Sequence, residues 1–123
     1  MELKQLKYIP LLTMHPIHKA ICTNDIENIK RLLEDGVDIE TPTIFDSTPL
    51  HKATTYGNLE IVKLFIKNGA KINSRNSLGQ TPLHCAFFND DIKMITFLVE
   101  NGACVGSKDN FGRIPFKCSQ KKK

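Results

Sequence analysis

A spacing of 33 residues runs through most of the chain. Four residue types return at this step: Pro16, Pro49, Pro82 and Pro115; His18, His51 and His84; Ala20, Ala53 and Ala86; and Gly36, Gly69 and Gly102. Independent residue types that keep one register indicate a repeated structural unit. Such units stack on one another, because no single unit can bury its apolar surface alone.

Each unit contains the signals of a short first helix. Thr48 and Thr81 suit the N-cap position, where a hydroxyl accepts a hydrogen bond from a free N–H of the first turn. The prolines that follow them suit the first helical position, where a missing N–H costs nothing. Gly57 predicts a bend after this helix, and its equivalents Asn24 and Asp90 predict the same left-handed bend with slight strain.

A second helix is predicted after each bend, in the segments IENIKRLLEDG, LEIVKLFIKNG and IKMITFLVENG. Their apolar residues recur at helical spacing, and each segment ends in a glycine that suits the residue after a helix. A turn at Gly79 or Gly112 precedes the next cap, whereas the earlier turn has Asp46 there, at some cost in backbone strain. The sequence therefore predicts an all-α repeat solenoid of helix-turn-helix units with β-turn fingers, in three full repeats and a partial fourth.

The strings TPLH, GNLEIVKLFIKNGAKIN and GQTPLH, together with the 33-residue step, resemble the ankyrin repeat family over about residues 13–117. On this resemblance the chain divides into segments 1–12 (a leader or cap), 13–42, 46–75 and 79–108 (three repeats), and 109–123 (a partial repeat and basic tail). The first repeat departs from the family pattern, with His15 in place of the capping threonine. The resemblance implies that the repeated histidines bond the turn backbone and tether neighbouring repeats.

Composition excludes several classes of function. The chain has no run of about 18 apolar residues, and its N-terminus is too polar for a secretory signal, so we expect no membrane association. The net charge is +4, but the three terminal lysines leave only +1 for the rest, which disfavours nucleic-acid binding. The spacing of Cys22, Cys85, Cys104 and Cys118 matches no zinc pattern, and free thiols in a reducing compartment are expected.

A catalytic or metal site has little support in the sequence. A metal site formed by His15, His18 and His51 competes with a structural role, but a residue that recurs once per unit belongs to the unit. The neighbouring carboxylates near the predicted bends are too close in sequence to face each other across a cleft. We expect no enzyme activity, no cofactor and no metal. A solvated surface is expected for the lysines of the body, namely Lys19, Lys30, Lys52, Lys63, Lys67 and Lys71.

Repeat scaffolds keep their framework and vary their surface, and the resemblance implies docking on the concave side formed by turn tips and first helices. The candidate partner-binding residues there are Phe45, Thr55, Tyr56, Leu78, Phe88, Asn89 and Phe111. Tyr56 is the strongest candidate, since its hydroxyl can stay hydrated while its ring makes contact. The alternative is that Leu78 and Phe111 pack against their own turns and that Phe88 turns into the stack. The turn with Ile44 beside Phe45 is the most individual surface.

We predict a monomeric, non-catalytic module that binds a cellular protein in the cytoplasm. Two alternatives resemble known ankyrin proteins: an inhibitor that masks the nuclear-targeting segment of a transcription factor, which would allow a nuclear location, and a truncated relative of a ubiquitin-ligase substrate adaptor. A third is nucleic-acid binding through Lys117 and the terminal lysines. The Lys-, Ile- and Asn-rich composition resembles ankyrin proteins of poxviruses, other large DNA viruses and intracellular bacteria, which would make the partner a host protein.

The two ends of the stack are expected to be covered differently. Only about one helical turn is available after Pro115, so Ile95, Leu98 and Val99 should be half covered. At the other end, the apolar residues of MELKQLKYI recur at three-residue spacing and predict a short covering helix. From these ends we expect marginal stability, or a truncated relative of a longer protein.

Overall fold

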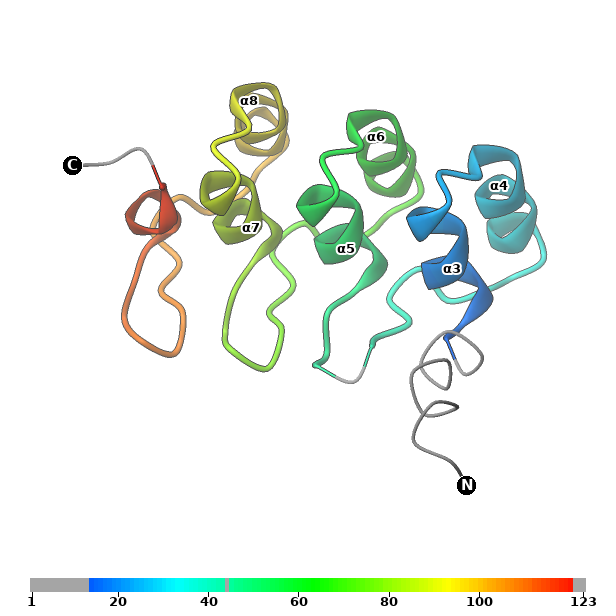
Figure 1. The fold of residues 1–123 in the computed structure, drawn as a ribbon, viewed down its shortest axis with the longest axis horizontal. Coiled ribbons are helices and arrows are strands. Elements are labelled where there is room, and N and C mark those ends of the chain that lie inside the picture. The colour runs from blue at the N-terminus through cyan, green and yellow to red at the C-terminus, as the bar shows by residue number, and fades with distance from the viewer. Residues whose placement is uncertain (1–13, 44, 121–123) are drawn as a thin grey trace, which may run out of the picture.

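Short helices follow one another in pairs along the computed structural model, which describes residues 14–43 and 45–120 (Figure 1). The helices are α3 (Pro16–Cys22), α4 (Ile26–Glu34), α5 (Pro49–Thr55), α6 (Leu59–Lys67), α7 (Pro82–Phe88), α8 (Ile92–Glu100) and the 3₁₀ helix η1 (Pro115–Cys118). Within these residues there is no strand, and no helix is long and apolar enough to cross a bilayer. This confirms the all-α repeat solenoid.

The helices begin where the sequence places cap residues. The hydroxyl of Thr48 accepts a hydrogen bond from the N–H of His51, and the Thr81 hydroxyl does the same for His84. Each second helix begins after Asp25, Asn58 or Asp91, whose side chain accepts from the N–H three residues later. In the first repeat Nδ1 of His15 takes this role and accepts from the N–H of Ile17.

Left-handed residues end the first helices as predicted. Gly57 has a φ of 73°, and its equivalents Asn24 and Asp90 have φ values of 56° and 52°. The glycines after the second helices are also left-handed, at φ values between 88° and 100°. Since only glycine enters this region without strain, the two non-glycine bends carry a small cost that is absent at Gly57.

The helices form two layers (Figure 1). The inner helices α3, α5, α7 and η1 lie in one row next to the fingers, and the outer helices α4, α6 and α8 lie in a second row on the side away from the fingers. Small inward residues of the inner row, such as Ala53 and Ala86, let the rows approach, and Phe65 of α6 fills the space between them. Adjacent inner helices contact each other directly, so the repeats share one continuous core.

The fingers are hairpin-like turns that are hydrogen-bonded side by side. The N–H of Ser77 donates to the carbonyl of Phe45 over 2.9 Å, and the N–H of Asn110 donates to the carbonyl of Leu78 over 2.9 Å. The second finger turns at Gly79, where a Cβ would lie 2.4 Å from the Asn110 side chain. This close approach, together with a φ of 76°, requires glycine at that position.

The repeated histidines connect each inner helix to a following finger. Nε2 of His18 lies 2.6 Å from the carbonyl oxygen of Thr41, and Nε2 of His51 lies 2.7 Å from that of Gln80. Nε2 of His84 lies 2.8 Å from the carbonyl oxygen of Arg113. All three imidazoles are buried. The tether that the ankyrin resemblance implied is therefore confirmed.

The C-terminal end is better covered than the sequence suggested. Leu98 is fully buried, so its predicted half-coverage is wrong. Met94 and Leu98 lie one helical turn apart and face the core together, whereas Val99 lies next along the helix and is 41% exposed. The predicted covering segment at 1–12, the side chain of Ile44 and the terminal lysines lie outside the described residues.

Candidate protein-binding groove

Two hollows lie along the inner helices and the fingers. The larger has a volume of about 870 Å³ and its lining includes Tyr56. The smaller has a volume of about 400 Å³ and its lining includes Phe88. Thr55, Gln80 and Cys85 line both, so the hollows adjoin. We call the two hollows together the inner groove.

Tyr56 stands at the end of α5 in the wall of the larger hollow. Its side chain is 55% exposed, but its hydroxyl lies 3.3 Å from Sγ of Cys22 in the preceding repeat. This hydrogen bond, together with burial, raises the pKa of Tyr56. The hydroxyl, expected to stay hydrated, thus also has a protein partner, because Cys22 occupies the position one repeat before Thr55. The exposed ring face remains free to contact a ligand.

Phe88 and Asn89 end α7 in the wall of the smaller hollow. Phe88 is 57% exposed, so it does not turn into the stack. Its neighbour Phe87 does, and packs edge-to-face on Phe116 with ring centroids 5.9 Å apart. Nδ2 of Asn89 donates to the carbonyl of Thr55 over 2.8 Å, which fixes the wall between the two hollows.

The finger tips carry the remaining candidates. Phe45, Leu78 and Phe111 are all exposed and do not pack down against their turns. Phe45 lines the larger hollow, whereas Leu78 and Phe111 line neither hollow. The Arg113 guanidinium lies 5.2 Å from the ring centroid of Phe111. The groove thus brings together five of the seven candidates, namely Phe45, Thr55, Tyr56, Phe88 and Asn89.

Several groove residues were absent from the candidates. Met14 and His15 close the larger hollow at the first repeat, Lys52 lines its wall, and Lys117 lines the smaller hollow. The sequence did contain a signal that the groove is positively charged, because the segments of α3, α5, α7 and η1 contain no Asp or Glu. Lys52, expected on the solvated surface, is half-buried and lines the larger hollow.

The repeat geometry agrees with a comparison to known families. Residues 17–109, more than half of the chain, match a family model described as Ankyrin repeats (3 copies). The chain belongs to the ankyrin repeat family. No curated protein matched it, so the assignment rests on this model and on the helix pairs, fingers and histidine tethers. Ankyrin repeats are in general non-catalytic protein–protein interaction modules.

The ankyrin histidines have no free nitrogen to offer a ligand in the second and third repeats. Because the backbone N–H of Thr48 can only donate, Nδ1 of His51 must accept from it, at 3.2 Å. The ring proton then lies on Nε2, which donates to the Gln80 carbonyl. Burial lowers the pKa of His18 and His51 and outweighs the carbonyl hydrogen bonds, which raise it. Burial therefore favours the neutral form of His18 and His51, which fits a structural role.

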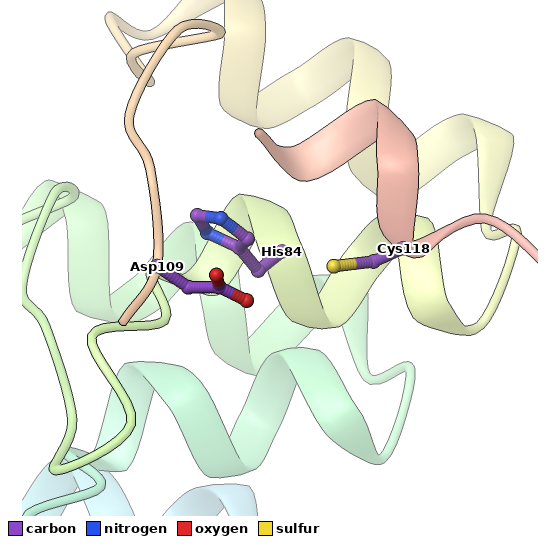
Figure 2. Close-up of side chains that lie close together, drawn as sticks. All are labelled: His84, Asp109 and Cys118. Atoms are coloured by element: carbon purple, nitrogen blue, oxygen red, sulfur yellow. The ribbon is translucent and has the colours of Figure 1, made fainter. Parts of the chain in front are cut away.

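One cluster of metal-ligand types occurs among the described residues, formed by His84, Asp109 and Cys118 (Figure 2). One ligand atom of each lies within 4.8 Å of the others. Nδ1 of His84 accepts from the Thr81 N–H, and its Nε2 bonds the Arg113 carbonyl. The Asp109 carboxylate accepts from two N–H groups and from the Arg113 guanidinium.

A metal at this cluster would have to break the tether that joins the third repeat to the last finger. Burial also raises the pKa of the Cys118 thiol, which opposes the thiolate form that a metal requires. Burial likewise raises the pKa of Cys85 in the groove wall. The cluster is therefore read as structural, and neither thiol is activated as a nucleophile.

Proposed function

We propose that this ankyrin repeat protein is a non-catalytic module that binds a segment of another protein in the inner groove. The carrying observation is the pair of exposed aromatic side chains in adjoining hollows, Tyr56 and Phe88. Aromatic residues dominate binding hot spots, and exposed apolar side chains grouped in a hollow mark interaction surfaces. A role without catalysis is also supported by the groove's histidines and cysteines. The Nε2 atoms of His51 and His84 are hydrogen-bonded to backbone carbonyls, and burial raises the pKa of the Cys85 and Cys118 thiols.

Four free cysteines support action in a reducing compartment, which we propose to be the cytoplasm. Under the poxvirus resemblance the partner would be a host protein. The transcription-factor alternative fits the groove less well, because nuclear-targeting segments are rich in Lys and Arg, and neither hollow is lined by a carboxylate of the described residues. No observation favours the ubiquitin-ligase alternative.

Affinity capture followed by mass spectrometry tests the proposal. The double change Tyr56→Ala with Phe88→Ala should remove specifically captured proteins, because it deletes both exposed rings of the groove. A matched control, Ile92→Ala with Val99→Ala, deletes exposed apolar groups of the outer helix α8 and should leave capture unchanged. Circular dichroism should show the same helical signal in both variants. If every captured protein survives the groove change, the inner groove is not the binding site.

A further inference from the structure

Charge is distributed unequally between the two layers of helices. The inner segments PIHKAIC, PLHKATT, PLHCAFF and PFKC contain no carboxylate, and three of them contain one lysine each, namely Lys19, Lys52 and Lys117. The outer helices carry both signs, with the carboxylates of Glu27, Glu34, Glu60 and Glu100 among lysines and an arginine. The layer that faces the groove therefore carries positive charge only, whereas the outer layer mixes both signs.

Two of the groove cations form no ion pair within the part of the chain that the structure describes. Among the described residues, the ion pairs are Lys30–Glu27 and Arg113–Asp109. Lys52 in the larger hollow and Lys117 in the smaller hollow form none with any described carboxylate. An unpaired ammonium in a hollow attracts a ligand anion more strongly than one on an open surface, because the walls reduce screening by water.

Three carboxylates near the fingers and the smaller hollow are held by hydrogen bonds. The Asp90 carboxylate accepts from the Gln120 N–H and from the Ser119 hydroxyl, beside the smaller hollow. The Glu40 carboxylate accepts from the Lys71 N–H over 2.8 Å and from the Ser74 hydroxyl over 3.2 Å. Asp109 is buried and fully engaged by the last finger, including Arg113. Among the described residues, none of these carboxylates forms an ion pair with Lys52 or Lys117, so both ammonium groups can pair with a partner.

We propose that the inner groove binds an extended acidic segment of a partner protein. An apolar side chain of the segment fills the larger hollow between Phe45 and Tyr56, and carboxylates pair with Lys52 and Lys117. This inference rests on the proposed function, since it names the chemistry of the partner in that groove. Paired charges steer and orient the segment, and the aromatic contacts supply the apolar anchor.

The spacing of the two lysines sets the length of the segment. Helix α5 contacts α7, and α7 contacts η1, so Lys52 and Lys117 are two helix spacings apart. Packed helices lie about 8–10 Å apart, which gives about 16–20 Å between the lysines. An extended chain rises about 3.3 Å per residue, so the two carboxylates would be about five or six residues apart.

A peptide fits this surface better than a nucleic acid does. Nucleic-acid sites present a dense track of Lys and Arg along the phosphate backbone. Here one unpaired lysine lines each hollow, beside the exposed rings of Tyr56 and Phe88, and the Arg113 guanidinium is held by Asp109. Two separated charges beside apolar contacts match a peptide with spaced carboxylates and an aliphatic or aromatic residue.

Selection from a random peptide library on the immobilised protein tests the inference. Peptides of about ten residues are long enough to span both hollows at about 3.3 Å per residue. The selected peptides should be enriched in Asp and Glu about five or six residues apart, with an aliphatic or aromatic residue close to the acidic residue that pairs with Lys52. Binding of a selected peptide should weaken as salt is raised from about 0.05 to 0.5 M.

Charge reversal identifies the lysines. Lys52→Glu with Lys117→Glu should weaken the selected peptide by at least about tenfold, because each exchange replaces an attraction by a repulsion. The control Lys67→Glu with Lys93→Glu makes the same net charge change on exposed outer positions and should leave the affinity within about twofold. Equal losses in the two variants would show a non-specific charge effect and overturn the proposal.

The remaining outcomes separate this inference from the proposed function. Selected peptides without acidic enrichment that still depend on Tyr56 and Phe88 would overturn the acidic partner and leave the groove function standing. Selected peptides that bind independently of both rings would overturn the proposed function as well. A labelled thymidine oligonucleotide that binds more tightly than any peptide, through Lys52 and Lys117, would replace the peptide by a nucleic acid. A selection with no enrichment over bare support also counts against the acidic segment.

Discussion

The first repeat begins its inner helix differently from the second and third. In the later repeats the threonine hydroxyl, the threonine N–H and Nδ1 of the following histidine form a closed hydrogen-bonded cap. In the first repeat His15 replaces the threonine and bonds the N–H of Ile17 instead. Nδ1 of His18 is then buried with no partner among the described residues. With His15 in place of threonine at the cap, Nδ1 of His18 therefore lacks the partner that Nδ1 of His51 and of His84 has.

The difference lies next to the larger hollow. Met14, His15 and His18 line that hollow, together with the fully hydrogen-bonded His51 of the second repeat. The finger after the first repeat is also irregular, with Asp46 at a φ of 59° where the others have glycine. The irregular cap and the irregular finger thus both belong to the first repeat and its finger, and the regular second repeat beside them is the reference for both.

The largest expected effect comes from deleting one tethering histidine in each kind of repeat. His51→Ala removes a buried ring, its bond to Gln80 and the acceptor for the Thr48 N–H, whereas His18→Ala removes the ring and one bond. A buried donor left without a partner costs about 1–3 kcal/mol, so His51→Ala should lose about 1–2 kcal/mol more unfolding free energy than His18→Ala. Urea titration at constant m-value measures the difference.

His84→Ala is the internal control for this comparison, because His84 makes the same set of bonds as His51. It should match His51→Ala rather than His18→Ala. Equal losses for all three variants would mean that the cap on the first repeat is as strong as the others. The unpartnered nitrogen would then have no energetic consequence.

The sequence was sufficient for features that one repeat determines by itself. The caps at Thr48 and Thr81 and the left-handed bends at Asn24 and Asp90 depend on residues that are close along the chain. The bond between Tyr56 and Cys22 joins adjacent repeats, and a one-repeat pattern does not specify it. The position of Lys52 in the groove also required the stacked geometry, because periodicity identifies the helix but not the hollow beside it.

A smaller effect is expected from making the first cap regular. The hydroxyl introduced by His15→Thr can accept from the His18 N–H and contact its Nδ1, as Thr48 does for His51. A good N-cap is worth about 1 kcal/mol, so His15→Thr should raise the unfolding free energy by about that amount. The reverse exchange, Thr48→His, should lower it by a similar amount. Urea titration of both variants checks the pair, and a loss of stability in His15→Thr would show that His15 already suits its site.

The smallest effect concerns the irregular finger. Asp46 adopts a left-handed backbone, which is strained for a residue with a Cβ, so Asp46→Gly should stabilise the protein by about 0.5 kcal/mol after the entropy of glycine is subtracted. Gly112→Asp is the matched reversal: the third finger has a φ of 79° there and no atom within 4 Å of an added Cβ, so backbone strain acts alone. It should destabilise by about the same amount. Thermal and urea unfolding of the two variants should therefore shift in opposite directions. If both variants destabilise the protein, the Asp46 side chain contributes an interaction that outweighs its backbone strain. Asp46 would then stabilise the first finger instead of straining it.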